Sequence, residues 1–193
     1  MTDNPFMQNS LDNECRMLCR TSKQNCYFAR DKSLNITKYT SDTEAYDNEV
    51  HFYLKFLGKH LFPDMNATNN TITYMVNNMK SLRSFLDDMS SFQKSKKYGI
   101  ILNELLSFVN TFQKLHFVHG NLNIDNVFVE VSSHSVSLIK FCVIDFGHSN
   151  TFVHENCEDF HTLEKSLSEY FEHNNKLLYL KNLVKRYTKL SYQ

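Results

Sequence analysis

Glycine, proline and tryptophan are scarce in this chain of 193 residues, which has 4 glycines, 2 prolines and no tryptophan. The glycines stand far apart, at Gly58, Gly99, Gly120 and Gly147. A loop that cradles phosphate with backbone N–H groups needs several neighbouring glycines, because only glycine lets the backbone approach phosphate so closely. The sequence therefore excludes a glycine-rich phosphate loop.

The chain also lacks an excess of one charge and a long apolar run. It has 21 Lys+Arg against 21 Asp+Glu and a pI near 7.1. Such a chain creates no field that attracts nucleic acid or anionic lipid, and its apolar runs are shorter than the ~20 residues that span a bilayer. No apolar segment of a secretion signal follows Met1. We expect an intracellular protein, cytoplasmic or nuclear, with no nucleic-acid or membrane partner.

The 5 cysteines are an odd number without a secretory context, so we expect reduced thiols. Two groups of residues offer zinc ligands. The first lies within 14 residues and comprises His148, His154, Cys157 and His161. Its spacings match no common structural zinc pattern. The second is weaker still and comprises Cys15, Cys19 and Cys26. We expect no structural zinc.

Aromatic residues are abundant, with 16 Phe and 10 Tyr, and hydrophobic residues make up 41% of the chain. These proportions are typical of a globular fold. Asparagine and lysine are also frequent, a usage found in AT-rich genomes such as those of large DNA viruses and parasites. This bias suggests a viral source.

Hydrophobic periodicity predicts strands and one helix in the first part of the chain. Residues 1–20 are polar without a clear period, and we expect a loose segment or a short helix. Residues 25–40 alternate as two short strands, and residues 71–76 predict another strand. Residues 42–61 have helical spacing and begin at a cap, Asp42 or Thr43. The predicted apolar face of this helix comprises Val50, Tyr53, Leu54, Leu57 and Leu61.

The second part is predicted to be mainly helical, with one β-hairpin. Helices are expected at residues 81–89, with Ser81 as the cap, and at 98–116, 158–171 and 175–190. The longest, 98–116, has a buried face formed by Ile101, Leu105, Phe108, Phe112 and Leu115. The hairpin lies between "NVFVEV" and "VSLIKFCVID". The order of elements predicts an α+β fold of two unequal lobes, joined near residues 77–81.

Two motifs flank the hairpin. The helix at 98–116 runs into "HFVHGNLNIDNVFVE", and the second hairpin strand runs into "VIDFG". His119-Gly120-Asn121-Leu122 matches H-[RG]-D-L, Asn126 matches a downstream Asn, and Asp145-Phe146-Gly147 matches D-F-G. Over residues 98–147 the chain resembles the protein-kinase-like superfamily, which includes protein kinases and aminoglycoside phosphotransferases. The glycine after the histidine, Gly120, resembles the loop of the phosphotransferase branch. The phenylalanine in D-F-G, Phe146, resembles the motif of the protein kinases.

The resemblance implies a minimal two-lobed kinase-like fold, with an N-terminal lobe at 1–78 and a reduced helical lobe at 79–193. It also implies a site for ATP and Mg²⁺, because Mg²⁺ prefers oxygen ligands and nucleotide phosphates supply several of them. Asn126 and Asp145 are then the metal ligands, and Gly147 belongs to the cofactor-binding set. By the same resemblance Lys38 is the phosphate-binding lysine and Glu49 its ion-pair partner, with Glu44 as a competing choice.

Asn121 departs from the family pattern. After His119, the family carries an Asp that accepts the proton of the substrate hydroxyl. A carboxamide has no useful basicity, and general-base catalysis contributes about 10²–10⁴-fold. The "HGN" loop is similar to that in the pseudokinase domains of Janus kinases, which keep the nucleotide site without robust catalysis. The resemblance therefore implies a catalytic set of Asn121, in the degenerate position of the base, and His119.

The C-terminal lobe is also shortened. Only 11 residues separate Gly147 from Asp159, and no A-P-E motif follows. Asp159 resembles the helix-starting Asp that braces the catalytic loop in this family. It is also an ordinary acidic residue of a helix N-terminus, where the macrodipole favours negative charge. The two interpretations are compatible.

Three functions follow from these observations. The first is a pseudokinase that acts as a regulatory module by binding a partner protein, such as a host or cellular kinase. The second is an atypical ATP- and Mg²⁺-dependent kinase or small-molecule phosphotransferase, in which Asn121 positions the hydroxyl. The third is a structural or transcription-associated viral subunit that uses the fold for assembly. Each of these three functions rests in part on the analogy with the kinase-like fold.

Overall fold

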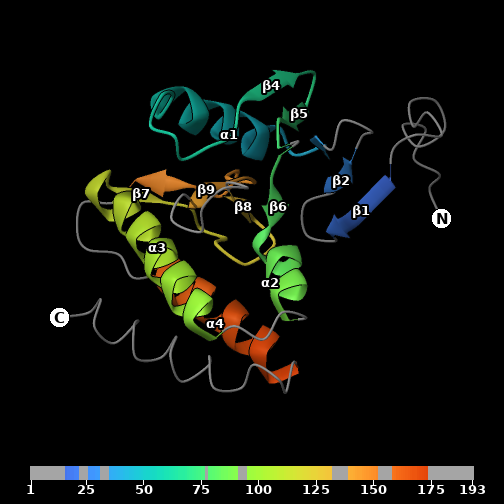
Figure 1. The fold of residues 1–193 in the computed structure, drawn as a ribbon. Helices are drawn as coiled ribbons and strands as arrows, with labels where there is room; N and C mark the ends of the chain where they lie inside the picture. Colours follow the sequence, from blue (N-terminus) through green and yellow to red (C-terminus); the bar gives the residue numbers. More distant parts are fainter. Residues whose placement is uncertain are drawn as a thin grey trace.

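The computed structural model describes residues 16–21, 26–30, 35–76, 78–90, 95–131, 139–151 and 158–173. Figure 1 shows one helix beside the N-terminal sheet and three helices below it, with the short central strands between. The predicted helix at 175–190 and the candidate zinc ligands Cys15, His154 and Cys157 lie outside the described residues.

The N-terminal sheet is antiparallel and has five described strands in the order β1-β2-β3-β5-β4. Their bounds are β1 Arg16–Thr21, β2 Cys26–Arg30, β3 Ile36–Thr40, β4 Met65–Thr68 and β5 Thr71–Tyr74. The strands expected within 25–40 and 71–76 are confirmed. Residues 16–21 form a strand, so the expectation of a loose or helical segment is wrong there. β3 lies in the centre, where Lys38 pairs with Phe28 on one side and Ile72 on the other.

Helix α1 (Thr43–Lys55) begins where the sequence predicts, because the Asp42 side chain accepts a hydrogen bond from the Ala45 N–H at 3.0 Å. It ends at Lys55 and does not continue to Leu61. The predicted apolar face is only partly correct: Leu61 is buried and Tyr53 packs against the core, but Leu54 is 62% exposed and Leu57 61% exposed. The helix instead buries Ala45, Glu49 and Phe52. Hydrophobic periodicity places the charged Glu49 on the solvent-exposed face of the helix, whereas its ion pair with Lys38 places it on the buried face.

The second region contains the remaining helices and two small sheets. The helices are α2 (Leu82–Ser90), α3 (Ser95–Lys114) and α4 (Glu158–His173). The order of one sheet is β6-β8-β9, and the other sheet pairs β10 with β7. The bounds of these strands are β6 Lys80–Ser81, β7 Phe117–Val118, β8 Val127–Val131, β9 Ile139–Val143 and β10 Asn150–Thr151. The predicted hairpin is β8–β9, and Ser81 caps α2 by accepting from the Ser84 N–H at 3.2 Å.

One hydrophobic cluster runs from the N-terminal sheet to α4. At its centre Phe146 stacks on Phe62 with ring centroids 4.4 Å apart, and Phe52 packs on Phe117 at 5.5 Å. These rings bring α1 and the D-F-G segment into the same core. Within the described ranges, no helix is long and apolar enough to cross a membrane.

Candidate functional site

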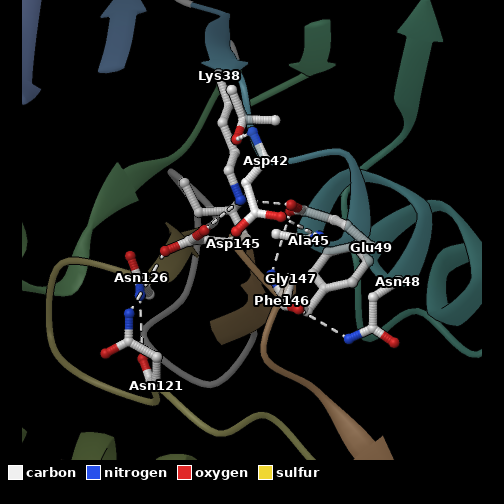
Figure 2. A network of polar contacts seen from close by, with 12 residues as sticks. Lys38, Asp42, Ala45, Asn48, Glu49, Asn121, Asn126, Asp145, Phe146 and Gly147 are labelled. Carbon is white, nitrogen blue, oxygen red and sulfur yellow. Dashed lines mark hydrogen bonds and ion pairs between the residues drawn. The ribbon is translucent and has the colours of Figure 1, made fainter. Parts of the chain in front are cut away.

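Lys38 reaches the site from the central strand of the N-terminal sheet. The side chains of β3 alternate between buried and half-buried, and Lys38 shares the buried face with Ile36 and Thr40. Its side chain is only 1% exposed. A buried ammonium requires partners of opposite charge, and Lys38 has two. Its Nζ lies 2.6 Å from Glu49 Oε2 and 2.6 Å from Asp145 Oδ1. Figure 2 shows Lys38 between the two carboxyl groups.

Glu49 comes from α1, which follows β3 closely. The Thr40 hydroxyl accepts from the Asp42 N–H at 3.1 Å, and the Asp42 side chain then caps the helix. This tight connection explains why only 11 positions separate Lys38 from Glu49. Glu44 is exposed and does not compete for Lys38.

Asp145 stands two residues after the end of strand β9, in a strained backbone conformation. Its φ is 64°, in the left-handed region that residues other than glycine rarely adopt. The Asp145 N–H donates to the Tyr74 hydroxyl at 3.2 Å, and the next N–H, of Phe146, donates to Glu49 Oε1 at 3.1 Å. Strained residues of this kind persist where the surroundings fix them, and they cluster at functional sites.

Burial and ion pairing oppose each other in this network. Burial works against the Lys38 ammonium, but the charges of Glu49 and Asp145 outweigh it and raise its pKa above the ordinary value. Burial also raises the pKa of Glu49 to about 7, although the Lys38 charge acts to lower it. Lys38 therefore remains charged at neutral pH.

The "HGN" loop is braced from α4. Asp159 Oδ2 accepts from the His119 N–H at 2.7 Å, and Oδ1 accepts from the Gly120 N–H at 3.0 Å. Asp159 thus has both expected roles: it braces the loop and it is an acidic residue in the first turn of α4. The loop also requires glycine at position 120, where φ is +78° and an added Cβ would lie 2.6 Å from the carbonyl oxygen of His148.

His119 is fully buried and in its neutral form. Its Nδ1 accepts from the Asn121 N–H at 3.2 Å, so Nε2 carries the proton and donates to the Ile144 carbonyl at 3.0 Å. Burial lowers the pKa of His119, because it disfavours the imidazolium. His119 is therefore a support of the loop in this geometry.

Three asparagines fix one another in the loop. Asn123 Oδ1 accepts from the N–H groups of Asp125 at 2.9 Å and Asn126 at 3.2 Å. The Asn123 amide nitrogen then donates to Asn121 Oδ1 at 3.2 Å. Asn121 consequently turns its own amide nitrogen to Asp145 Oδ2, at 3.4 Å. Asn126 donates to the Asn121 carbonyl at 3.0 Å. The structure thus brings Asn121, Asn126 and Asp145 together (Figure 2).

Oxygen ligands for a divalent cation are few in this arrangement. Asp145 would supply carboxylate oxygens and Asn126 its carbonyl oxygen. Yet Oδ1 of Asp145 already contacts the Lys38 ammonium, and Oδ2 faces the Asn121 amide nitrogen. No three His, Cys, Asp or Glu side chains of the described residues gather as metal ligands. This donor set does not fit a resident Mg²⁺, and the metal roles of Asn126 and Asp145 stay predictions.

Two residues of the site carry no sequence signal that we recognised. The Asn48 amide donates to the carbonyls of Gly147 and Ser149, both at 2.8 Å, and the Ser149 hydroxyl donates to the His119 carbonyl at 3.1 Å. Together they tie α1, the D-F-G segment and the "HGN" loop to one another.

Of the zinc candidates, His148 and His161 are exposed.

Comparison with protein families matches residues 64–183 to the family described as "Lipopolysaccharide kinase (Kdo/WaaP) family". The chain belongs to this family. The match covers the loop, the hairpin and the D-F-G segment of this Kdo/WaaP-family protein. The family is one of kinases, that is, phosphotransferases of a kind that typically uses ATP and Mg²⁺. No curated protein matches the sequence.

A solved structure described as "WaaP in complex with acyl carrier protein" is similar to this Kdo/WaaP-family protein. The similarity covers 98% of this chain and 93% of that chain, with a TM-score of 0.56 and 12% sequence identity. At this identity the likeness shows the fold. The predicted protein-kinase-like fold, in a minimal form, is confirmed.

Proposed function

We propose that this protein is a non-catalytic member of the Kdo/WaaP family that acts by binding a partner protein. One observation carries the proposal: the position of the catalytic base holds Asn121, whose carboxamide oxygen accepts from Asn123 and whose nitrogen faces Asp145. An amide accepts no proton at neutral pH, and its oxygen is already an acceptor for Asn123. General-base assistance, about 10²–10⁴-fold in rate, is therefore lost.

A phosphoryl-transfer assay tests the loss of catalysis. Wild type and Asp145→Ala are incubated with radiolabelled ATP and Mg²⁺, and release of phosphate and its transfer to protein or lipopolysaccharide are measured. We expect the two proteins to be indistinguishable. Turnover by the wild type that disappears in Asp145→Ala would refute the proposal.

The partner is the second part of the proposal. The structure with a similar fold contains acyl carrier protein, which supports a protein ligand for this fold and makes acyl carrier protein the first partner to test. Calorimetric titration of the full chain with purified acyl carrier protein measures this directly. Binding retained in Asp145→Ala would separate partner recognition from the nucleotide-site network.

An ATP-dependent kinase is the second candidate, and the Lys38 geometry favours it. Lys38 is held at 2.6 Å from both Glu49 and Asp145, which orients an ammonium as phosphoryl transfer requires. Positioning alone supports a residual rate. Turnover that rises about 10²-fold or more in Asn121→Asp would identify a kinase weakened by a missing base.

A further inference from the structure

We propose that the Asn121 amide stands in for a divalent cation at Asp145, so that the network is complete without metal. The family typically uses Mg²⁺, whereas the donor set here does not fit it. Asn121 would then be a positioning residue that directs the positive end of its N–H dipole at the carboxylate. The inference deepens the proposed function and shares with it the assignment of Asn121.

The orientation of the Asn121 amide is determined by backbone groups. The N–H groups of Asp125 and Asn126 can only donate, so the atom of Asn123 that faces them is its oxygen. The nitrogen of Asn123 therefore faces Asn121, whose oxygen must receive it. The remaining end of Asn121 is the donor that points at Asp145 Oδ2. The amide cannot reverse without breaking this chain of bonds.

The charge of the network explains why a donor is needed at that point. Among the described residues of the network, the single cation Lys38 serves the two carboxyl groups of Glu49 and Asp145. Lys38 contacts Oδ1 of Asp145 and leaves Oδ2 to Asn121. A buried carboxylate oxygen requires a donor or a cation, and the amide provides the donor. At 3.4 Å the contact is long for a hydrogen bond, so its attraction is mainly electrostatic.

An aspartate at position 121 would reverse this balance. Asp and Asn have the same shape, so Asn121→Asp places a carboxylate oxygen where the amide nitrogen lies, 3.4 Å from Asp145 Oδ2. Two carboxylates at such a distance cannot both ionise without a proton or cation between them. With the Asn126 carbonyl nearby, they form a set of oxygen ligands suited to Mg²⁺.

Thermal melting of the full chain with Mg²⁺ alone, without nucleotide, tests the proposal. Wild type and Asn121→Asp are melted in EDTA and then over a millimolar Mg²⁺ series. We expect wild type to melt at the same temperature throughout. Asn121→Asp should melt at least about 3 °C lower in EDTA and recover that shift with Mg²⁺. Asn103→Asp, the same change on an exposed position of α3, is the matched control and should show no Mg²⁺ response.

The double variant Asn121→Asp/Asp145→Asn provides a second measurement. It restores one carboxylate and one amide to the pair, so its melting should again be independent of Mg²⁺. A merely structural role of Asn121 predicts destabilisation without any Mg²⁺ response, and that result would overturn the proposal. So would a Mg²⁺ response in wild type as large as that of Asn121→Asp.

Solubility gives the same answer should Asn121→Asp fail to fold in EDTA. Protein that is soluble only when purified in Mg²⁺ supports the proposal, and insolubility in both conditions overturns it. None of these readouts involves phosphoryl transfer. A failure here is therefore distinguishable from a failure of the proposed function.

Discussion

Lys38 is the residue on which the buried charges depend. Replacing it with alanine leaves Glu49 and Asp145 facing each other without a cation, and breaking a buried ion pair in this way costs about 3–5 kcal/mol. We expect Lys38→Ala to lower the free energy of unfolding in urea by that amount. Lys80→Ala is the control, because Lys80 pairs with Asp88 at the same 2.6 Å but with both side chains about 60% exposed. Its loss should be about 0–1 kcal/mol. Equal losses would contradict this account.

Two glycines with the same backbone conformation provide a second test at this scale. Gly120 and Gly58 have φ of +78° and +81°, but an added Cβ at Gly58 meets open space, whereas at Gly120 it lies 2.6 Å from the His148 carbonyl oxygen. Gly58→Ala should cost about 1 kcal/mol for the left-handed conformation alone. Gly120→Ala should cost about 1–3 kcal/mol more, because backbone must move. Urea denaturation of the pair measures the difference, and similar losses would show that the loop yields easily.

The sequence predicted the charged and amide residues of the site better than the residues that hold its backbone in place. Lys38, Glu49, Asn126 and Asp145 follow from the resemblance to the kinase-like family, and the structure brings them into one network. Asn48 and Ser149 could not be found in this way, because each acts through a single hydrogen-bonding group with backbone carbonyls. Such contacts depend on where the chain passes in space, and no spacing in the sequence encodes that.

At the scale of elements, Asn48 joins α1 to the segment after β9. Asn48→Ala leaves the carbonyls of Gly147 and Ser149 without this donor, which should cost about 1–3 kcal/mol. Hydrogen exchange should accelerate at the Phe146 and Ser149 amides, whose bonds lie in the same segment.

Asn66→Ala serves as the control for this prediction, because Asn66 is exposed on β4. A surface change of this kind should stay within about 0.5 kcal/mol. Unchanged exchange at Phe146 and Ser149 in Asn48→Ala would show that the ring stacking of Phe146 alone holds the segment.

Element prediction succeeded for α2, where periodicity and the Ser81 cap agree, and for α3 and the β8–β9 hairpin, where the hydrophobic period is clear. For α1 it found the start of the helix but wrongly placed Leu54 and Leu57 on the buried face, where the structure instead has Ala45, Glu49 and Phe52. The reason is that the Lys38–Glu49 pair fixes the rotation of the helix, and a charged residue weighs as polar in any periodic pattern. Strands β1 and β4 were not predicted, because short strands of this kind gain their stability from neighbouring strands rather than from their own hydrophobic pattern.

At the scale of the whole molecule, the burial of His119 makes stability depend on pH. The unfolded chain has an ordinary histidine pKa of about 6.5, and burial lowers the pKa of folded His119. Below pH 6.5 the unfolded state therefore binds a proton that the folded state does not. The free energy of unfolding should fall with decreasing pH, by up to about 1.4 kcal/mol per pH unit.

Other groups act in the opposite direction. Burial raises the pKa of Glu49 to about 7, so its contribution favours folding at low pH and is lost as the pH rises through 7. Comparison with His119→Gln removes this shared term. Denaturant titrations of both proteins between about pH 5 and 7.5 should show the difference in their stabilities growing in favour of His119→Gln as the pH falls. Parallel curves would mean that folded His119 takes up its proton freely.

The tight turn from β3 into α1 has a mechanical consequence. The Thr40 hydroxyl holds the Asp42 N–H, and the Asp42 side chain holds the first turn of the helix. The connection between β3 and α1 is short and hydrogen-bonded, so we expect the two elements to move together. We therefore expect any displacement of α1 to displace β3, and Lys38 with it.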